Sequence, residues 1–146
     1  MIYEPNTNCI VTAGNKCDIY FIEMFTYERR IIFRGHKDSV NCLAIDARIL
    51  FSGSDDHTIR MWDTVSCQYL TYIDAHETGV RSLLFVEDTG HLISTANGEI
   101  NIWNYPQKLL IKVFYTLYIS ISKFRNLLNL KHFYAYAIYK KKNVSM

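Results

Sequence analysis

The chain repeats a unit of about forty residues, and this period restricts the folds that it can adopt. One copy runs from Gly35-His36 to Trp62-Asp63, and the next runs from His76 to Trp103. The two histidines lie 40 positions apart and the two tryptophans 41 positions apart. Such a period is typical of stacked repeats, in which each copy buries its apolar face against its neighbours.

An eroded third copy precedes these two. Residues 10–23 align without a gap to residues 50–63, although Ile22 and Glu23 stand where the later copy has tryptophan and aspartate. Three copies therefore lie within the first 105 residues, and we expect them to form three similar structural units.

Residues 35–63, which begin with Gly-His and end with Trp-Asp, resemble the WD-repeat family. The resemblance implies that each copy is one four-stranded blade of a β-propeller. We therefore predict an all-β fold, an incomplete β-propeller of about three four-stranded antiparallel blades within residues 1–105 or slightly beyond. The approximate blades are 1–34, 35–74 and 75–115, with residues 109–115 as the last outer strand. We also expect the chain to be a fragment of a larger propeller, because three blades cannot close a ring.

Apolar runs and turn residues predict the strands within each blade. Residues 40–45 and 80–85 are short apolar runs suited to inner strands. Asn97-Gly98 separates two β-like runs, and this pair favours a type I′ hairpin turn with positive φ at both positions.

The resemblance also implies a buried hydrogen-bond chain in each intact repeat. Its donors and acceptors are suitable, because an imidazole can join a carboxylate to a hydroxyl that accepts from an indole N–H. In the first intact repeat the matching residues are His36, Ser52, Asp56 and Trp62. In the second they are His76, Ser94, Asn97 and Trp103, so that an amide replaces the carboxylate. The eroded copy has Lys16 and Ile22 at matching positions and is expected to lack the chain.

The charges divide the chain into two parts. Residues 1–105 contain all fourteen acidic residues and eight Lys/Arg, a balance of −6, whereas residues 106–146 contain eight Lys/Arg and no acids. The sequence leaves three alternatives for the aromatic-rich tail at 116–146: it is helical, it is disordered, or it is not a natural continuation of the repeats. A functional tail of this composition would bind nucleic acid or an anionic membrane surface.

The sequence does not predict an enzyme. It has no nucleophile with a base, no phosphate-binding glycine loop and no zinc spacing, so we expect no cofactor and no metal. His36, Asp38, Asp55, Asp56 and His57 lie close together in sequence, but two of them occupy positions that the repeat uses for its architecture. We interpret this cluster as structural.

The resemblance implies a non-catalytic scaffold that binds other proteins through its loops. Six loop residues are candidates for these contacts by position: Arg34, Lys37, Asp55, His57, Glu77 and Thr78. The expected partners are other proteins of unknown identity, the remaining blades of a larger propeller, or a second copy joined through open blade edges.

The cysteines and the apolar segments bear on the cellular location. The four cysteines are scattered, with no Cys-x-x-Cys pair and no secretory signal, and this favours a reduced intracellular protein. Between the two main compartments we expect the cytoplasm rather than the nucleus. No uninterrupted apolar segment is long enough to predict a spanning helix.

Overall fold

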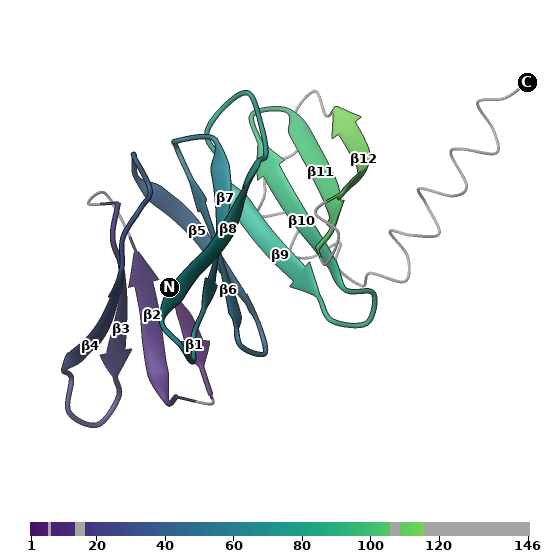
Figure 1. Ribbon diagram of the computed structural model, residues 1–146. Helices are drawn as coiled ribbons and strands as arrows, with labels where there is room; N and C mark the ends of the chain where they lie inside the picture. The colour runs from purple at the N-terminus through teal and green to yellow at the C-terminus, as the bar shows by residue number, and fades with distance from the viewer. Residues whose placement is uncertain (6, 14–16, 106–108, 116–146) are drawn as a thin grey trace, which may run out of the picture. The chain divides into compact units, whose positions relative to one another are not determined.

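The computed structural model describes residues 1–5, 7–13, 17–105 and 109–115. The expectations for the tail at 116–146 lie outside these residues. Within the described part, twelve strands form three four-stranded antiparallel sheets (Figure 1). The first sheet contains β1 (Ile2–Glu4), β2 (Cys9–Ala13), β3 (Ile19–Glu23) and β4 (Arg29–Phe33). The second contains β5 (Val40–Asp46), β6 (Ile49–Ser54), β7 (Thr58–Asp63) and β8 (Gln68–Asp74). The third contains β9 (Ser82–Val86), β10 (His91–Ala96), β11 (Glu99–Asn104) and β12 (Leu109–Tyr115).

Each sheet is a meander in which consecutive strands pair with one another. The third and fourth strands of every sheet shift register at the same place, after Phe21, Met61 and Ile102. An extra residue on one strand bends the pair and increases its twist. The shared bulge shows that the eroded first copy keeps the backbone plan of the other two.

The second sheet is buried on both faces because its strands alternate between two apolar clusters. Along β7, Ile59 and Met61 belong to one cluster, while Trp62 points to the opposite face and belongs to the other. Period-two alternation places successive side chains on opposite faces of a strand. The tryptophan of this sheet therefore packs toward the first sheet, and the two aliphatic side chains pack toward the third.

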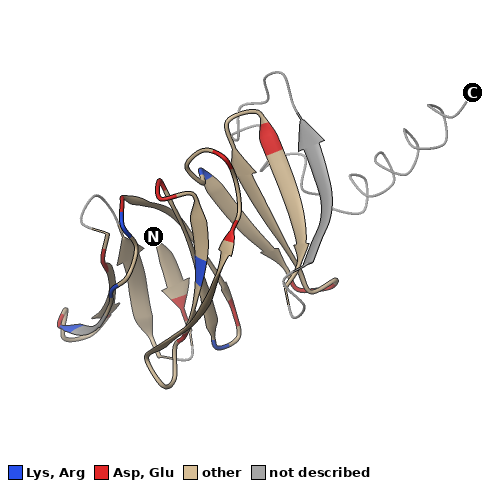
Figure 2. Ribbon diagram, turned by 45° about the horizontal axis from the view of Figure 1, so that its top comes forward, with Lys and Arg blue, Asp and Glu red and all other residues tan. Residues whose placement is uncertain are grey.

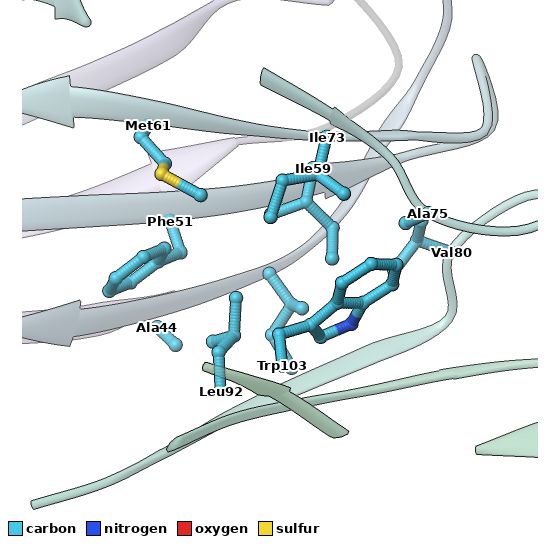
Figure 3. Packing of buried hydrophobic residues seen from close by; sticks show 10 residues of the cluster. Ala44, Phe51, Ile59, Met61, Ile73, Ala75, Val80, Leu92 and Trp103 are labelled. Carbon is cyan, nitrogen blue, oxygen red and sulfur yellow. The ribbon is translucent and has the colours of Figure 1, made fainter. Parts of the chain in front are cut away.

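The two clusters are the same interface built twice, about forty residues apart. Between the first and second sheets the packed residues are Val11, Ile19, Phe21, Phe33, Val40, Leu50 and Trp62. Between the second and third sheets their counterparts are Phe51, Ile59, Met61, Ile73, Val80, Leu92 and Trp103 (Figure 3). Truncating a buried tryptophan of this kind typically costs about 3 to 5 kcal/mol.

Two local expectations were wrong. Strand β9 begins at Ser82 rather than at Val80, because the Val80 amide donates to the Ser54 carbonyl of the second sheet at 2.9 Å. The turn at Asn97-Gly98 is not type I′. Gly98 has φ of +74°, whereas Asn97 is not among the residues with positive φ. In a type II turn only the second central residue has positive φ, and here that residue is Gly98.

Candidate interaction surface and the hydrogen-bond chains that support it

A continuous hydrogen-bond chain crosses the second sheet. The indole N–H of Trp62 donates to Ser52 Oγ at 2.8 Å, and Ser52 Oγ lies 2.7 Å from His36 Nε2. On the other side of the ring, His36 Nδ1 lies 2.8 Å from Asp56 Oδ2. The structure thus brings together the four residues that the family resemblance implied, and it buries the histidine, the serine and the tryptophan.

The hydrogen-bond partner on each side of the ring determines the tautomer of His36. An ionised carboxylate can only accept, so Nδ1 carries the proton and donates to Asp56. The bare Nε2 then accepts from the Ser52 hydroxyl, whose oxygen accepts from Trp62. In this arrangement the imidazole is neutral and each group of the chain has a partner.

The pKa values of the pair follow from burial and from these hydrogen bonds. Burial lowers the pKa of His36 below its ordinary value, although Asp56 acts in the opposite direction. For Asp56, burial by itself would raise the pKa. Hydrogen bonds from Thr58, from the Lys37 amide and from His36 outweigh burial and hold the pKa of the carboxyl well below its usual range. The carboxylate therefore ties the loop before β5 to the start of β7.

The third sheet has a second chain with the same histidine, serine and tryptophan. Trp103 Nε1 donates to Ser94 Oγ at 2.8 Å, and His76 Nε2 lies 2.7 Å from the same oxygen. The partner of His76 Nδ1 is Glu99 Oε2, at 2.8 Å. The prediction of Asn97 as the fourth member was wrong.

Turn length explains why Glu99, rather than Asn97, contacts His76. The β6–β7 turn has three residues between Ser54 and Thr58, whereas the β10–β11 turn has only two between Ala96 and Glu99. The shorter turn has no counterpart of Asp56. Glu99 stands at the first position of its strand, as Thr58 does, and its longer side chain reaches back to the histidine. Asp56 lies six positions before Trp62, and the same count back from Trp103 gives Asn97, so spacing along the chain gave no signal for Glu99.

Asn101 adds a contact that sequence reasoning missed. Its side-chain amide donates to the Ala75 carbonyl at 2.9 Å and lies 3.4 Å from His76 Nδ1. Asn101 pairs with Ser94 across the strands, as Arg60 does with Ser52, so the register gave a signal for its location. Asn97 itself is exposed, and its backbone amide lies 3.4 Å from Thr78 Oγ1.

The first sheet has Ile22 in place of the tryptophan. An isoleucine side chain has no donor, so the chain of the other two sheets cannot form through this position. Lys16, which the sequence also placed there, lies outside the described residues.

Asp55 has partners within the fold. Its Oδ1 accepts from Asn41 Nδ2 at 2.8 Å and lies 2.8 Å from an Arg81 guanidinium nitrogen. A Cβ added to Gly79 would collide with this carboxylate. The side chain therefore links the second and third sheets, and this geometry favours a structural role over the predicted contact with a partner.

The other five candidates lie on three neighbouring loops. Lys37, His57, Glu77, Thr78 and Arg34 are exposed, and Arg34 Nε lies 3.4 Å from Asp18 Oδ2. Backbone bonds hold the loops together, since Asp55 N donates to Ser39 O at 2.9 Å and Ala75 N to His57 O at 3.1 Å. Figure 2 shows charged residues of the described chain both in such turns and on strands, where most of them lie near a strand end.

Two other kinds of site, a membrane-spanning helix and a metal site, are absent from the described residues. No helix there has the length and apolar character needed to cross a bilayer. In the same part of the chain, no group of three or more His, Cys, Asp or Glu residues is placed to hold a metal ion.

Two segments of the chain, residues 27–63 and 67–104, match the family model described as "WD domain, G-beta repeat". Together they cover more than half of the chain. The chain belongs to the WD40 repeat family.

Several curated proteins with WD repeats are similar to this WD40 chain over part of its length. Human WD repeat- and FYVE domain-containing protein 4 is 29% identical over 109 residues, which are 68% of this chain and 3% of that protein. Human THO complex subunit 6 is 27% identical over 53% of this chain and 23% of its own length. Mouse kinesin-like protein KIF21B is 41% identical over 47% of this chain and 4% of its own. The chain thus spans a small part of each relative.

Solved structures show the same fold. "Structure of U3-55K" matches with a TM-score of 0.72 and 24% identity, over 78% of this chain and 38% of that one. "Crystal structure of RRP9 WD40 repeats" matches with the same TM-score over 37% of its chain. The three sheets are therefore blades of a partial WD40 propeller.

Proposed function

We propose that this WD40 chain is a non-catalytic scaffold that binds other proteins through the loops bearing Lys37, His57, Glu77 and Thr78. The observation that supports this most is that these side chains are exposed while the backbone beneath them is anchored. The Lys37 amide donates to the buried Asp56 carboxylate at 2.9 Å, and His57 accepts from the Ala75 amide. Exposed residues on an anchored scaffold are well suited to recognition.

The charges on these loops indicate a polar partner surface. Lys37 is a cation, and Glu77 lies next to His76 on the following loop, so the surface carries both signs. Mixed charges give specificity and orientation more than affinity. We propose that the partner is a protein surface with complementary charges, and Arg34 extends the same side of the molecule.

Further blades are part of the proposal. In the first sheet, Ile10 and Ile22 lie on the face that corresponds to the face with Leu50 and Trp62 in the second sheet. Ile10 and Ile22 are only partly buried. Tyr3, opposite Ile10, is 54% exposed. We infer that the aliphatic face of another blade covers these residues, as the first sheet covers Trp62.

The location and the tail complete the proposal. All four cysteines are free thiols, and burial raises the pKa of Cys42 to about 12. We propose an intracellular protein on this ground, with the cytoplasm favoured.

The alternative function, binding of nucleic acid or an anionic membrane by the basic tail, depends mostly on residues outside the described ones. No described residue favours it, so we do not propose it here.

The test exchanges charges on the loops. The wild-type protein and the Lys37→Glu/Glu77→Lys variant are each expressed in cells and isolated. The proteins that co-purify with each are quantified by mass spectrometry. Glu87→Lys/Asp88→Lys is the matched control, because these exposed acids lie in the β9–β10 turn, at the other end of the strands. We expect at least one partner to fall more than fivefold in the loop variant alone. Unchanged partners in a folded loop variant would refute the proposal.

A further inference from the structure

The turn between β3 and β4 exposes large apolar side chains. We call residues 24–27 the aromatic turn; Phe25 is 82% exposed, Tyr27 is 80% exposed and Met24 is 39% exposed. Single exposed apolar side chains are ordinary on protein surfaces, but a group of large ones is more informative. Here three of four consecutive residues are of this kind.

Hydrogen bonds hold the aromatic turn in one conformation. The Tyr27 amide donates to the Glu23 carbonyl at 2.9 Å, and the Glu23 amide donates to the Glu28 carbonyl at 3.0 Å. Thr26 Oγ1 donates to the Glu23 carboxylate at 2.7 Å. The Met24 amide donates to Asn8 O at 3.2 Å, which joins the turn to the one between β1 and β2. The aromatic rings are therefore presented from a fixed backbone.

The same turn in the second sheet shows that the backbone does not require aromatic residues. Between β7 and β8, Cys67 has φ of 60°, matching the 58° of Tyr27 forty positions earlier. Val65 takes the place of Phe25 and is 70% exposed. The Asp63 carboxylate accepts from the Val65 and Ser66 amides at 2.8 and 2.9 Å. A valine and a cysteine thus support the turn that carries phenylalanine and tyrosine in the first sheet.

The aromatic turn therefore carries costs that the fold itself does not demand. A bulky residue at positive φ is unfavourable, and glycine or asparagine would be the ordinary choice at Tyr27. Two aromatic rings in water give up the burial that such side chains usually gain. Because the positive φ recurs at Cys67, it belongs to the turn itself, and the exposed group of large apolar side chains is the feature that is characteristic of binding sites.

We propose that the aromatic turn docks into an apolar pocket of a partner protein whose rim carries lysine or arginine. Phe25 and Tyr27 supply the rigid aromatic anchors that dominate many interfaces. The carboxylates of Glu23 and Glu28 flank the anchors, while the guanidinium of the neighbouring Arg29 lies over the Tyr20 ring, 4.8 Å from its centroid. A basic rim complements the two carboxylates. This site lies at the end of the strands opposite to the loops of Lys37 and Glu77, so it is independent of the function proposed above.

The experiment places a photo-crosslinking benzoylphenylalanine at position 25 of the full chain in cells. The matched control carries the same probe at Val65, at the equivalent place in the second sheet. We expect the probe at 25 to join one protein at least tenfold more than the probe at 65. The joined peptide of that protein is expected to contain apolar residues beside lysine or arginine, and Glu28→Lys should lower the yield at least fivefold.

A second variant tests the anchors without the probe. Phe25→Val/Tyr27→Asn copies the small side chain of the second turn and introduces a residue suited to positive φ, so the melting temperature should not fall. Loss of the crosslinked partner from the purified variant supports the proposal. Its retention overturns it, as do equal crosslinking at 25 and 65, crosslinks only to a second copy of this chain, or crosslinks only to lipid. The Lys37→Glu/Glu77→Lys variant should leave the crosslink at 25 unchanged, which separates this result from the loop test.

Discussion

The second and third sheets build the same buried chain of indole, hydroxyl and imidazole, but they take the terminal carboxylate from different places. In the second sheet Asp56 comes from the turn and receives hydrogen bonds from His36, Lys37 and Thr58. In the third sheet Glu99 comes from the first position of a strand and contacts His76. The location of the charge relative to the ring is thus preserved while its position in the sequence is not.

This difference indicates what the fold requires. A buried imidazole needs an acceptor for its Nδ1–H, because an unsatisfied donor away from water is costly. The two carboxylates differ in how they hold the loop before the inner strand. Asp56 accepts from the Lys37 backbone amide of that loop, whereas the Glu99 carboxylate contacts the histidine. The two carboxylates should therefore contribute unequally to stability, and the following predictions test that inequality.

The largest effect is expected for Asp56→Ala. This change leaves His36 Nδ1 without its acceptor and removes the hydrogen bonds from Lys37 and Thr58. The free energy of unfolding should fall by about 2 to 4 kcal/mol, as is usual when a buried charged network is broken. Urea unfolding followed by tryptophan fluorescence measures it. Asp38→Ala, which removes an exposed carboxylate nearby, is the control and should change stability by less than about 0.5 kcal/mol.

The pH dependence of stability should report the lowered pKa values of His36 and Asp56. Both pKa values are lowered by folding, so the unfolded chain binds protons more readily and stability falls as the pH falls. The contribution of His36 is complete above its ordinary pKa of 6.5 and is lost as the pH falls below it. That of Asp56 is complete above 3.8 and is lost at lower pH.

A single substitution tests the second of these steps. Asp56→Asn removes the titrating carboxyl, so the difference in stability between wild type and this variant should narrow between about pH 4.5 and about pH 3.5, a range below the ordinary pKa of His36. Urea unfolding at both values is the measurement. A difference that stays constant down to that pH would contradict the lowered pKa.

A smaller loss is expected for Glu99→Ala. His76 loses its acceptor here too, but Glu99 has more access to water and does not bind a loop amide in the way that Asp56 does. We expect a loss of about 1 to 2 kcal/mol in the same urea experiment. A loss equal to that of Asp56→Ala would mean that the histidine acceptor alone decides stability.

Exchange of the turn sharpens this result. Replacing Asn97-Gly98 by Asp-Asp-His, together with Glu99→Thr, gives the third sheet the turn of the second. If turn length determines which residue supplies the carboxylate, this variant should be within about 1 kcal/mol of wild type, whereas Glu99→Thr alone should lose as much as Glu99→Ala. Equal losses in both variants would refute that explanation.

The smallest effect is expected for Asn97→Ala. The Asn97 side chain is exposed, and the contact to Thr78 uses its backbone amide, which the alanine retains. Stability should change by less than about 0.5 kcal/mol, because exposed substitutions of this kind are usually close to neutral. A loss comparable to that of Glu99→Ala would restore Asn97 as a member of the chain.

The sequence by itself determined the repeat, the all-β blades and most of the strands. Features set by the order of residues along the chain can be predicted from sequence patterns. They include the forty-residue period, the alternation in β7 and the apolar run at 109–115. The family resemblance implied the members His36, Ser52 and Trp62, because each has a fixed place in the family's repeat. The assignment of Asn97 failed because alignment at a shortened turn does not say which residue fills the gap.

Only the tertiary structure decided the contacts that cross between segments. Glu99 reaches His76 because two strands bring them together and because its side chain is long enough. Asp55 contacts Arg81 across two sheets, so its charge serves the fold rather than a free surface. The exposure of Phe25 and Tyr27 depends on what packs around their turn, and a sequence pattern does not contain that information. In each case distance through space, rather than spacing along the chain, determines what a side chain can do.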